Sequence, residues 1–256
     1  MRGTQHQITT STPIDAPPPL NASAHALFLD LDGTLVEIQD RPNEVHASAD
    51  LRALLRRVSD SMSGAIAVIT GRSLGDLGEI IGGAVDYAAG VHGFEIQRGN
   101  RISRDQIEIS LLEAARADAL RLLDENGLAP LVEDKHASLA LHYRQIPDAE
   151  EAIQRIARDV AATHGLRVLQ GKMVVEIIAT ARTKGHAVTV LMAAPPFLGR
   201  KPIAIGDDRT DEDAFTAAKR MGGFGILVGE PRPTGADYVL PSTSAVALWL
   251  AQGQSS

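Results

Sequence analysis

The chain has 256 residues, a formal net charge of −7, no cysteine, 44% hydrophobic residues and 22% charged residues. This length suits one large domain or two small ones, and the hydrophobic share is sufficient for a core, which excludes a disordered protein. The lack of cysteine excludes disulfides and Cys-based zinc sites, the acidic surplus argues against general nucleic-acid binding, and no apolar run reaches the roughly 18 residues of a membrane span.

The first 24 residues are rich in Thr, Ser and Pro and contain a run of prolines at 17–19. No apolar stretch suitable for a signal peptide follows Arg2, so we expect a flexible tail and a cytoplasmic protein. We also expect the last residues, 252–256, to fray.

Short, fully apolar runs at 26–29, 65–69, 202–205 and 224–228 are typical of buried parallel strands. A helical spacing of leucines and valine follows the first run, over 48–60. Near the end of the chain, Thr210 and Asp213 predict a capping box that opens a helix reaching Met221. This alternation of strands and helices predicts an α/β fold with a doubly wound, Rossmann-like parallel sheet, formed by residues 25–105 and 179–252.

The middle of the chain, residues 106–178, has a different pattern. Two short alternating segments, 131–135 and 138–144, predict a hairpin, and a second pair, 166–170 and 173–177, is joined at Gly171. Between the pairs, residues 148–164 predict a helix that begins at a capping box of Asp148 and Glu151 and ends at Gly165. A further helix is expected over 109–125. The sequence therefore predicts an α+β module of ββαββ type, inserted into the parallel domain as a cap.

Polar residues follow three of the predicted parallel strands. Because ligands bind at the carboxyl ends of such strands, we expect these residues to lie at one edge of the sheet. They are Asp30 and Asp32 after the first strand, Thr70, Gly71 and Arg72 after the second, and Asp207, Asp208 and Asp211 after the third. Any one aspartate in this position is more often a turn or cap residue, but paired aspartates after two separate strands favour a site. Closely spaced carboxylates repel one another, and a hard cation such as Mg²⁺ relieves that repulsion.

These segments resemble the four motifs of the haloacid dehalogenase (HAD) superfamily of phosphotransferases. The first is Asp-Leu-Asp-Gly-Thr at 30–34, the second is Thr70, the third is Lys184, and the fourth is Gly-Asp-Asp-Arg-Thr-Asp at 206–211. The resemblance implies that Asp30 is the nucleophile that forms an aspartyl-phosphate and that Asp32 is the general acid and base.

The same resemblance implies the ligands of the phosphate and of the metal. Mg²⁺ would be held by Asp30, the carbonyl of Asp32 and Asp207, with support from Asp208 and Asp211. The phosphate would be bound by Thr70, Gly71 and Lys184. A lysine at the start of a helix is disfavoured by the helix dipole, which is consistent with an anionic partner for Lys184. Arg72 is either a substrate contact or part of an ordinary salt bridge.

Two pairs of charged residues recur on the predicted cap strands. Residues i and i+2 of a strand share a face, so Glu133 lies beside Lys135, and Lys172 lies on the same face as Glu176. Taken alone, this pattern favours a solvated face of the cap sheet over a sugar-binding face.

A second resemblance, to the trehalose-6-phosphate phosphatase family, shifts that balance. It is carried by Gly-Val-His-Gly at 90–93, Val-Glu-Asp-Lys at 132–135, His-Tyr-Arg at 142–144, Gly171 and Lys172 with Glu176, and Thr-Asp-Glu-Asp-Ala-Phe at 210–215. It implies that Glu133, Lys135, Lys172 and Glu176 contact the disaccharide. His92 and His142 also match the family pattern, and we interpret both as structural.

The resemblance implies a Mg²⁺-dependent hydrolase that converts trehalose 6-phosphate to trehalose and phosphate. The expected partner is a small phosphosugar, with no nucleic acid or membrane, and the enzyme is expected to be a monomer. Two alternatives stay open. One is a phosphatase for another phosphosugar, such as sucrose 6-phosphate, or a phosphohexomutase. The other is a non-catalytic regulatory module, which the presence of Asp30, Asp32, Lys184 and Asp207 disfavours.

Overall fold

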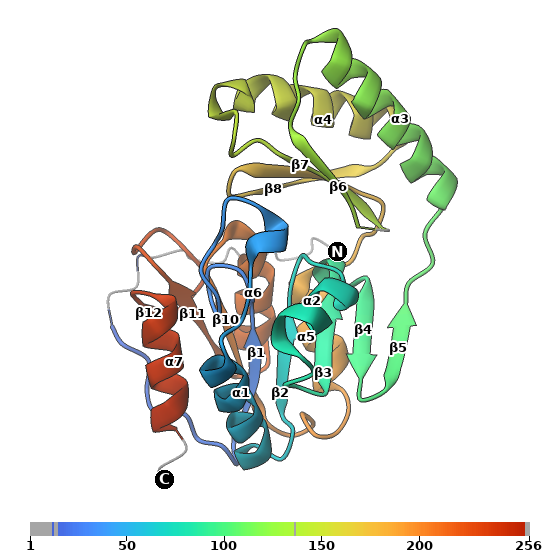
Figure 1. Ribbon diagram of the computed structural model, residues 1–256. Helices are drawn as coiled ribbons and strands as arrows, with labels where there is room; N and C mark the ends of the chain where they lie inside the picture. Colours follow the sequence, from blue (N-terminus) through green and yellow to red (C-terminus); the bar gives the residue numbers. More distant parts are fainter. Residues whose placement is uncertain (1–11, 13–14, 136, 254–256) are drawn as a thin grey trace, which may run out of the picture.

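The computed structural model describes residues 12, 15–135 and 137–253, which form two β-sheets, each with its own helices (Figure 1). The larger sheet has eight strands in the order β12-β11-β10-β1-β2-β3-β4-β5. Its strands are β1 (His25–Leu29), β2 (Ile66–Ile69), β3 (Tyr87–Gly90), β4 (Glu95–Arg98), β5 (Arg101–Arg104), β10 (Lys201–Gly206), β11 (Phe224–Val228) and β12 (Tyr238–Leu240).

β1 lies at the centre of this sheet, and the chain extends from it in both directions. It pairs in parallel with β2 on one side and with β10 on the other. Neighbouring strands pair in parallel from β12 to β3, and β4 and β5 then add two antiparallel pairings at one edge. The prediction of a doubly wound α/β sheet is thus confirmed. The strand order reverses at β1, with β2 on one side and β10 on the other.

The helices of the larger sheet cover both of its faces (Figure 1). They are α1 (Ala49–Ser61), α2 (Leu74–Ile81), α5 (Lys184–Met192), α6 (Glu212–Arg220) and α7 (Thr243–Gln252). α1 packs beside α7, and α5 packs beside α6. Ser48 caps α1 by accepting a hydrogen bond from the Leu51 amide. The apolar strands lie buried between these layers and share one hydrophobic cluster.

The smaller sheet is antiparallel, with the order β6-β7-β9-β8. Its strands are β6 (Leu131–Asp134), β7 (Ser138–His142), β8 (Arg167–Gly171) and β9 (Val174–Ile178). Helices α3 (Ile109–Glu125) and α4 (Glu150–His164) cover one face and share a second hydrophobic cluster with it. The opposite face is turned toward the larger sheet (Figure 1). These elements follow the predicted ββαββ pattern, and α4 ends at Gly165 in the left-handed conformation.

Two predicted helix starts differ from the structure. The capping box near residue 210 is formed by Asp208 and Asp211, not by Thr210 and Asp213, and it opens a short 3-10 turn (Arg209–Asp211) before α6. No side chain caps α4, so the predicted box of Asp148 and Glu151 is wrong. A 3-10 turn, Pro147–Ala149, leads into α4 instead.

Part of the segment predicted as a flexible tail, residues 1–24, is in contact with the larger sheet. Residues 1–11, 13 and 14 lie outside the described part of the chain. Beyond them, Leu20 is buried in the hydrophobic cluster, and Trp249 Nε1 donates a hydrogen bond to the Pro18 carbonyl. The Val239 amide donates to the carbonyl of Asp15. Of the C-terminal residues expected to fray, 254–256 also lie outside the described part. Within the described residues, no helix is long and apolar enough to cross a membrane.

Candidate active site

Three neighbouring parallel strands direct their polar residues to one edge of the larger sheet. β1 ends before Asp30, β2 ends before Thr70, and β10 ends before Asp207. Since these strands lie side by side in the order β10-β1-β2, the three residues meet at their carboxyl ends. The smaller sheet faces this edge, and residues of both sheets line a cavity of about 160 Å³ between them.

A cluster of carboxylates surrounds Lys184. Oxygen atoms of Asp30, Asp207 and Asp211 all lie within 4.8 Å of one another. Lys184 Nζ donates to Asp30 Oδ1 and to Asp211 Oδ1, at 2.7 Å each. Burial opposes the charge of Lys184, but these two carboxylates outweigh it and hold the pKa of the ammonium above its usual value.

The same environment disfavours charge on two of the aspartates. Burial raises the pKa of Asp30 well above its usual value, and Asp211 and Asp207 add to the effect although Lys184 opposes it. Burial, together with Asp211, raises the pKa of Asp207 to about 7. The cluster therefore holds more negative charge than Lys184 alone neutralises, which is the electrostatic setting in which a bound cation is stabilised.

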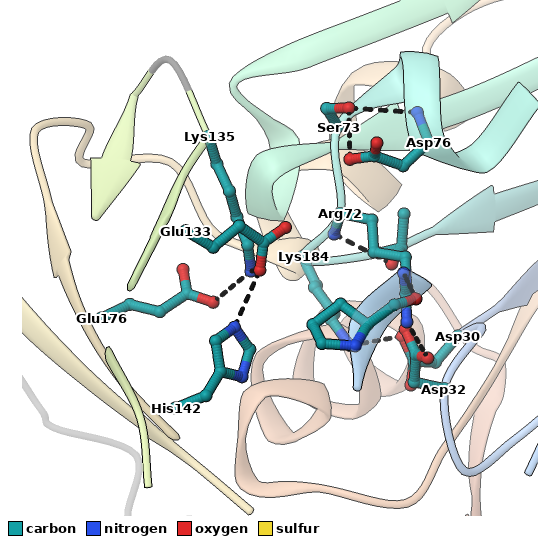
Figure 2. Close-up of polar contacts among 12 residues, drawn as sticks. Asp30, Asp32, Arg72, Ser73, Asp76, Glu133, Lys135, His142, Glu176 and Lys184 are labelled. Atoms are coloured by element: carbon teal, nitrogen blue, oxygen red, sulfur yellow. Dashed lines mark hydrogen bonds and ion pairs between the residues drawn. The ribbon is translucent and has the colours of Figure 1, made fainter. Parts of the chain in front are cut away.

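Asp32 points to a different partner from Asp30. Its carboxylate accepts two hydrogen bonds from Arg72, at 2.7 Å from Nε and 2.8 Å from Nη2, and Arg72 Nη1 also donates to the Pro42 carbonyl (Figure 2). Burial opposes the charge of Arg72, but the bonds and the charge of Asp32 raise its pKa. The Asp32 side chain is thus outside the carboxylate cluster, and metal binding through its carbonyl stays a prediction. Of the two alternatives for Arg72, the salt bridge is present, and Arg72 also lines the cavity.

The remaining predicted aspartate of this group, Asp208, serves as a helix cap. Its Oδ1 accepts from the Arg209 amide at 2.6 Å, while Asp211 Oδ2 accepts from the Asp208 amide at 3.0 Å. Asp208 nevertheless lines the cavity. Asp211 therefore both closes the capping box and contacts Lys184.

Hydrogen bonds to the residues after β3 and to β4 hold the loop that follows β2 in place. Thr70 is buried, and its Oγ1 accepts a hydrogen bond from the Arg72 amide at 3.1 Å. Sequence reasoning missed Glu95, a buried carboxylate on β4 that accepts from the Leu74 amide at 2.8 Å and from Arg104 Nε at 2.7 Å. Glu95 thereby fixes the point where the loop enters α2. A lone glutamate on a short polar strand gave no signal of this role.

The cap residues form a compact polar group opposite Asp30 (Figure 2). Lys135 Nζ donates to Glu176 Oε1 at 2.7 Å, and Lys135 and Glu176 are both buried. Glu133 Oε2 lies 2.8 Å from His142 Nε2. Ser138, which sequence reasoning missed, donates to Glu176 Oε2 at 3.1 Å. The solvated face that the strand pattern favoured is therefore wrong for these residues, because that face is covered by the larger sheet.

Neighbouring charges keep these cap groups ionised despite their burial. Burial disfavours the charged forms, but Lys135 and His92 hold the pKa of Glu176 below its usual range. In the same way, Glu176 and Glu133 raise the pKa of Lys135, and the bond to His142 lowers that of Glu133. Lys172 is exposed at the cavity rim, beside Arg144.

A second cavity of about 580 Å³ adjoins the first between α2 and the cap strand β6. The two share Pro42, Val45, Arg72 and Glu133 in their linings. The carboxylate cluster thus lies at one end of a larger space whose walls belong to both sheets.

Comparison with known proteins gives a consistent result. The trehalose-phosphatase family model matches residues 28–244. A probable trehalose-phosphate phosphatase of Sinorhizobium fredii is 38% identical over 216 residues, 81% of this chain and 79% of the relative. The trehalose-6-phosphate phosphatase of Escherichia coli is 34% identical over 243 residues, 93% of this chain and 89% of the relative.

The fold is shared with solved structures. The C-terminal domain of Candida albicans trehalose-6-phosphate phosphatase superposes with a TM-score of 0.80 at 20% identity, covering 96% of this chain and 98% of that domain. Phosphatases of the HAD superfamily have the same fold, with TM-scores of 0.62 and 0.59. The fold class expected from the sequence is therefore confirmed.

Proposed function

Because the chain belongs to the trehalose-phosphatase family, we propose that it hydrolyses trehalose 6-phosphate to trehalose and inorganic phosphate. One observation carries the proposal beyond family membership. The buried Asp30, in contact with Lys184, lies at the cavity that the charged cap residues Lys135 and Glu176 also line. Groups suited to bind a phosphate and groups suited to bind a polyol therefore line one cavity, which supports a phosphosugar as the substrate.

In the first half of the reaction, a carboxylate oxygen of Asp30 attacks phosphorus and forms an aspartyl-phosphate as the bond to the sugar oxygen breaks. Lys184 places a positive charge beside the phosphoryl oxygens, and the buried Thr70 hydroxyl is available to donate a hydrogen bond to one of them. The departing sugar oxygen takes a proton from Asp32.

In the second half, Asp32 accepts a proton from water, which attacks phosphorus, releases phosphate and regenerates the Asp30 carboxylate. Both oxygens of Asp32 accept from Arg72, which competes with the proton that the first half of the reaction requires on Asp32. We therefore propose that Arg72 releases Asp32 when substrate binds, since the guanidinium gains the phosphate as an alternative partner.

The carboxylate cluster fits the Mg²⁺ that the superfamily implies. Asp30, Asp207 and Asp211 offer three hard oxygen donors, which are the ligands Mg²⁺ prefers, and Lys184 alone offsets only part of the repulsion among them. Bound Mg²⁺ would neutralise charge between Asp30 and the phosphoryl group. Asp208 would support the site by fixing the turn that carries Asp211.

We propose that residues 106–178 act as a cap over the core formed by 25–105 and 179–252. The separate hydrophobic clusters of the two sheets support this division. Glu133, Lys135, Lys172 and Glu176 would bind the sugar hydroxyls, and closure would exclude water from the reacting phosphate. A cytoplasmic, monomeric enzyme stays a prediction from the sequence.

The proposal is tested by measuring phosphate release from trehalose 6-phosphate, sucrose 6-phosphate, glucose 6-phosphate and p-nitrophenyl phosphate, with Mg²⁺ or with EDTA. We expect trehalose 6-phosphate to be preferred and EDTA to abolish turnover. Asp30→Asn removes the nucleophile and should abolish release, whereas Asp60→Asn, an exposed position on α1, should not. Equal rates on all four esters would refute the substrate, and undiminished release by Asp30→Asn would refute the mechanism.

A further inference from the structure

His92 is a buried imidazole that the mechanism above does not use. It lies in the 3-10 turn Val91–Gly93 that follows β3, and it lines the cavity with Asp30 and Glu176. Its side chain is buried, yet neither ring nitrogen makes a hydrogen bond among the described residues. A buried polar group without a partner costs about 1–3 kcal/mol, so its retention needs an explanation.

The backbone of His92 is also strained. Its φ of 56° is in the left-handed region, and the preceding Val91, a β-branched residue that seldom adopts this region, has a φ of 44°. The conformation is fixed by its surroundings, because the His92 amide donates to the Thr70 carbonyl at 3.0 Å and the Val91 amide donates to the Arg72 carbonyl at 2.8 Å. The turn therefore holds the imidazole beside the loop of residues 70–72, here called the phosphate loop, and the ring lines the cavity.

On one side, the ring packs directly against Gly71. A Cβ added to Gly71 would lie 2.8 Å from His92 Cε1 and 2.9 Å from Nε2, so a glycine is required between Thr70 and Arg72 to admit the ring. The imidazole is thus in contact with the loop that carries the predicted phosphate ligands.

On its other side, the ring faces the cap. His92 Nε2 lies 3.4 Å from Glu176 Oε2, although the two atoms are not aligned for a hydrogen bond. Glu176 Oε1 already accepts from Lys135, and Oε2 accepts from Ser138. At 3.4 Å, Nε2 and Oε2 are close enough to form a hydrogen bond once the two groups reorient. The His92 side chain therefore lies between the phosphate loop and the Glu176 carboxylate of the cap.

We propose that His92 is a positioning residue for sugar recognition: with substrate bound, its Nε2–H donates to Glu176 Oε2 and fixes the carboxylate over the phosphate loop. The inference rests on the proposed function and deepens it. It predicts that His92 contributes to turnover of a sugar phosphate through Glu176 and contributes little to turnover of an ester without a sugar.

The first experiment compares kcat/KM for trehalose 6-phosphate and for p-nitrophenyl phosphate in His92→Phe. Phenylalanine keeps a ring against Gly71 but cannot donate, so we expect about a tenfold or greater loss on the phosphosugar and an unchanged rate on the aryl ester. His92→Asn provides a second variant that tolerates the left-handed backbone but is too short to reach Glu176, and the same selective loss is expected. The control is His25→Phe, at the opposite end of the strand that leads to Asp30.

The second experiment combines His92→Phe with Glu176→Ala, which removes the acceptor. If His92 acts through Glu176, the double variant will be no worse on trehalose 6-phosphate than Glu176→Ala alone. The inference would be overturned if the losses in kcat/KM of the two single variants multiply in the double variant. It would also be overturned if His92→Phe and His92→Asn each lose as much activity on p-nitrophenyl phosphate as on trehalose 6-phosphate. A wild-type protein that does not prefer trehalose 6-phosphate over the aryl ester would instead refute the proposed function, so the two failures are distinguishable.

Discussion

At the scale of single residues, the site is defined by how buried charges are paired. Lys184 neutralises part of the charge of Asp30 and Asp211, while Arg72 neutralises Asp32. Lys184 and Lys172 favour the charged form of Asp207 only in part, because burial and Asp211 outweigh them and raise its pKa to about 7. The residual negative charge is therefore concentrated at the position where a cation is expected.

The raised pKa of Asp207 predicts pH-dependent metal binding. Below about pH 7 the metal-free site carries a proton on Asp207, and Mg²⁺ must displace it, so the Mg²⁺ affinity should fall by up to about tenfold per pH unit as the pH drops. Above this pKa the affinity should level off. Isothermal titration calorimetry with Mg²⁺ on either side of pH 7 measures the dependence. An affinity that is constant over this range in the wild type would contradict the prediction.

At the scale of elements, the close packing of α5 on α6 positions Lys184. Gly185 follows Lys184 in α5, and a Cβ added there would lie 2.8 Å from the carbonyl carbon of Asp213 in α6. The small residue therefore allows the two helices to approach and sets the depth of the lysine in the site. Strand register also positions residues of the site. β1, β2 and β10 end together, which brings Asp30, Thr70 and Asp207 to one edge of the sheet.

Gly185→Ala should reduce both stability and activity. The added methyl group pushes α5 from α6, which should cost about 1–3 kcal/mol in the free energy of unfolding and displace Lys184 from Asp30. Gly78→Ala is the matched control, because Gly78 is exposed in α2 with nothing near its Cβ position. That change should instead stabilise the protein by about 0.5–1 kcal/mol through helix propensity. Denaturant melts and phosphate release measure both effects, and equal behaviour of the two variants would contradict this explanation.

At the scale of the whole molecule, each sheet packs on its own large hydrophobic cluster, and the polar site lies between the sheets. A third, small cluster of Val91, Phe94 and Ala137 joins the two sides. Two chain segments connect the sheets, one between β5 and α3 and the other between β9 and α5. The Arg182 guanidinium on the second connection bonds the Asp105 carboxylate on the first. This partly exposed pair ties the connections together but contributes little stability, because water screens it.

The cap sheet packs on a smaller hydrophobic cluster, separate from that of the core sheet. We therefore expect the cap to unfold at a lower denaturant concentration than the core. Leu141→Ala, at a fully buried position of the cap cluster, should lower the free energy of unfolding of the cap by about 2–5 kcal/mol. Trp249, the single tryptophan, packs in the core cluster, so its fluorescence reports the core, whereas circular dichroism reports both sheets. The dichroism transition should move to lower denaturant while the fluorescence transition stays in place.

Leu29→Ala, at an equally buried position of β1, is the control and should shift the fluorescence transition. Coincident transitions in Leu141→Ala would show that the sheets unfold as one unit.

The sequence by itself determined the class of the fold and which polar residues follow the central parallel strands. Fully apolar strands and strong amphipathic helices are local patterns, and they predicted β1, β2, β10, β11 and the cap elements within a few residues. The short strand β3, the polar hairpin of β4 and β5, and β12 were not predicted, because short strands of polar or small residues depend on their neighbours for pairing.

Only the tertiary structure decided how the charged residues are partnered. The strand pattern placed Lys135 and Glu176 on a solvated face, but the larger sheet covers that face and buries both. Likewise, the pairing of Arg72 with Asp32 and the contacts of His92 with Gly71 and Glu176 join residues from separate elements. The physical reason is that burial and Coulomb attraction depend on distances across the fold, which a sequence pattern, limited to neighbours along a strand or helix, does not contain.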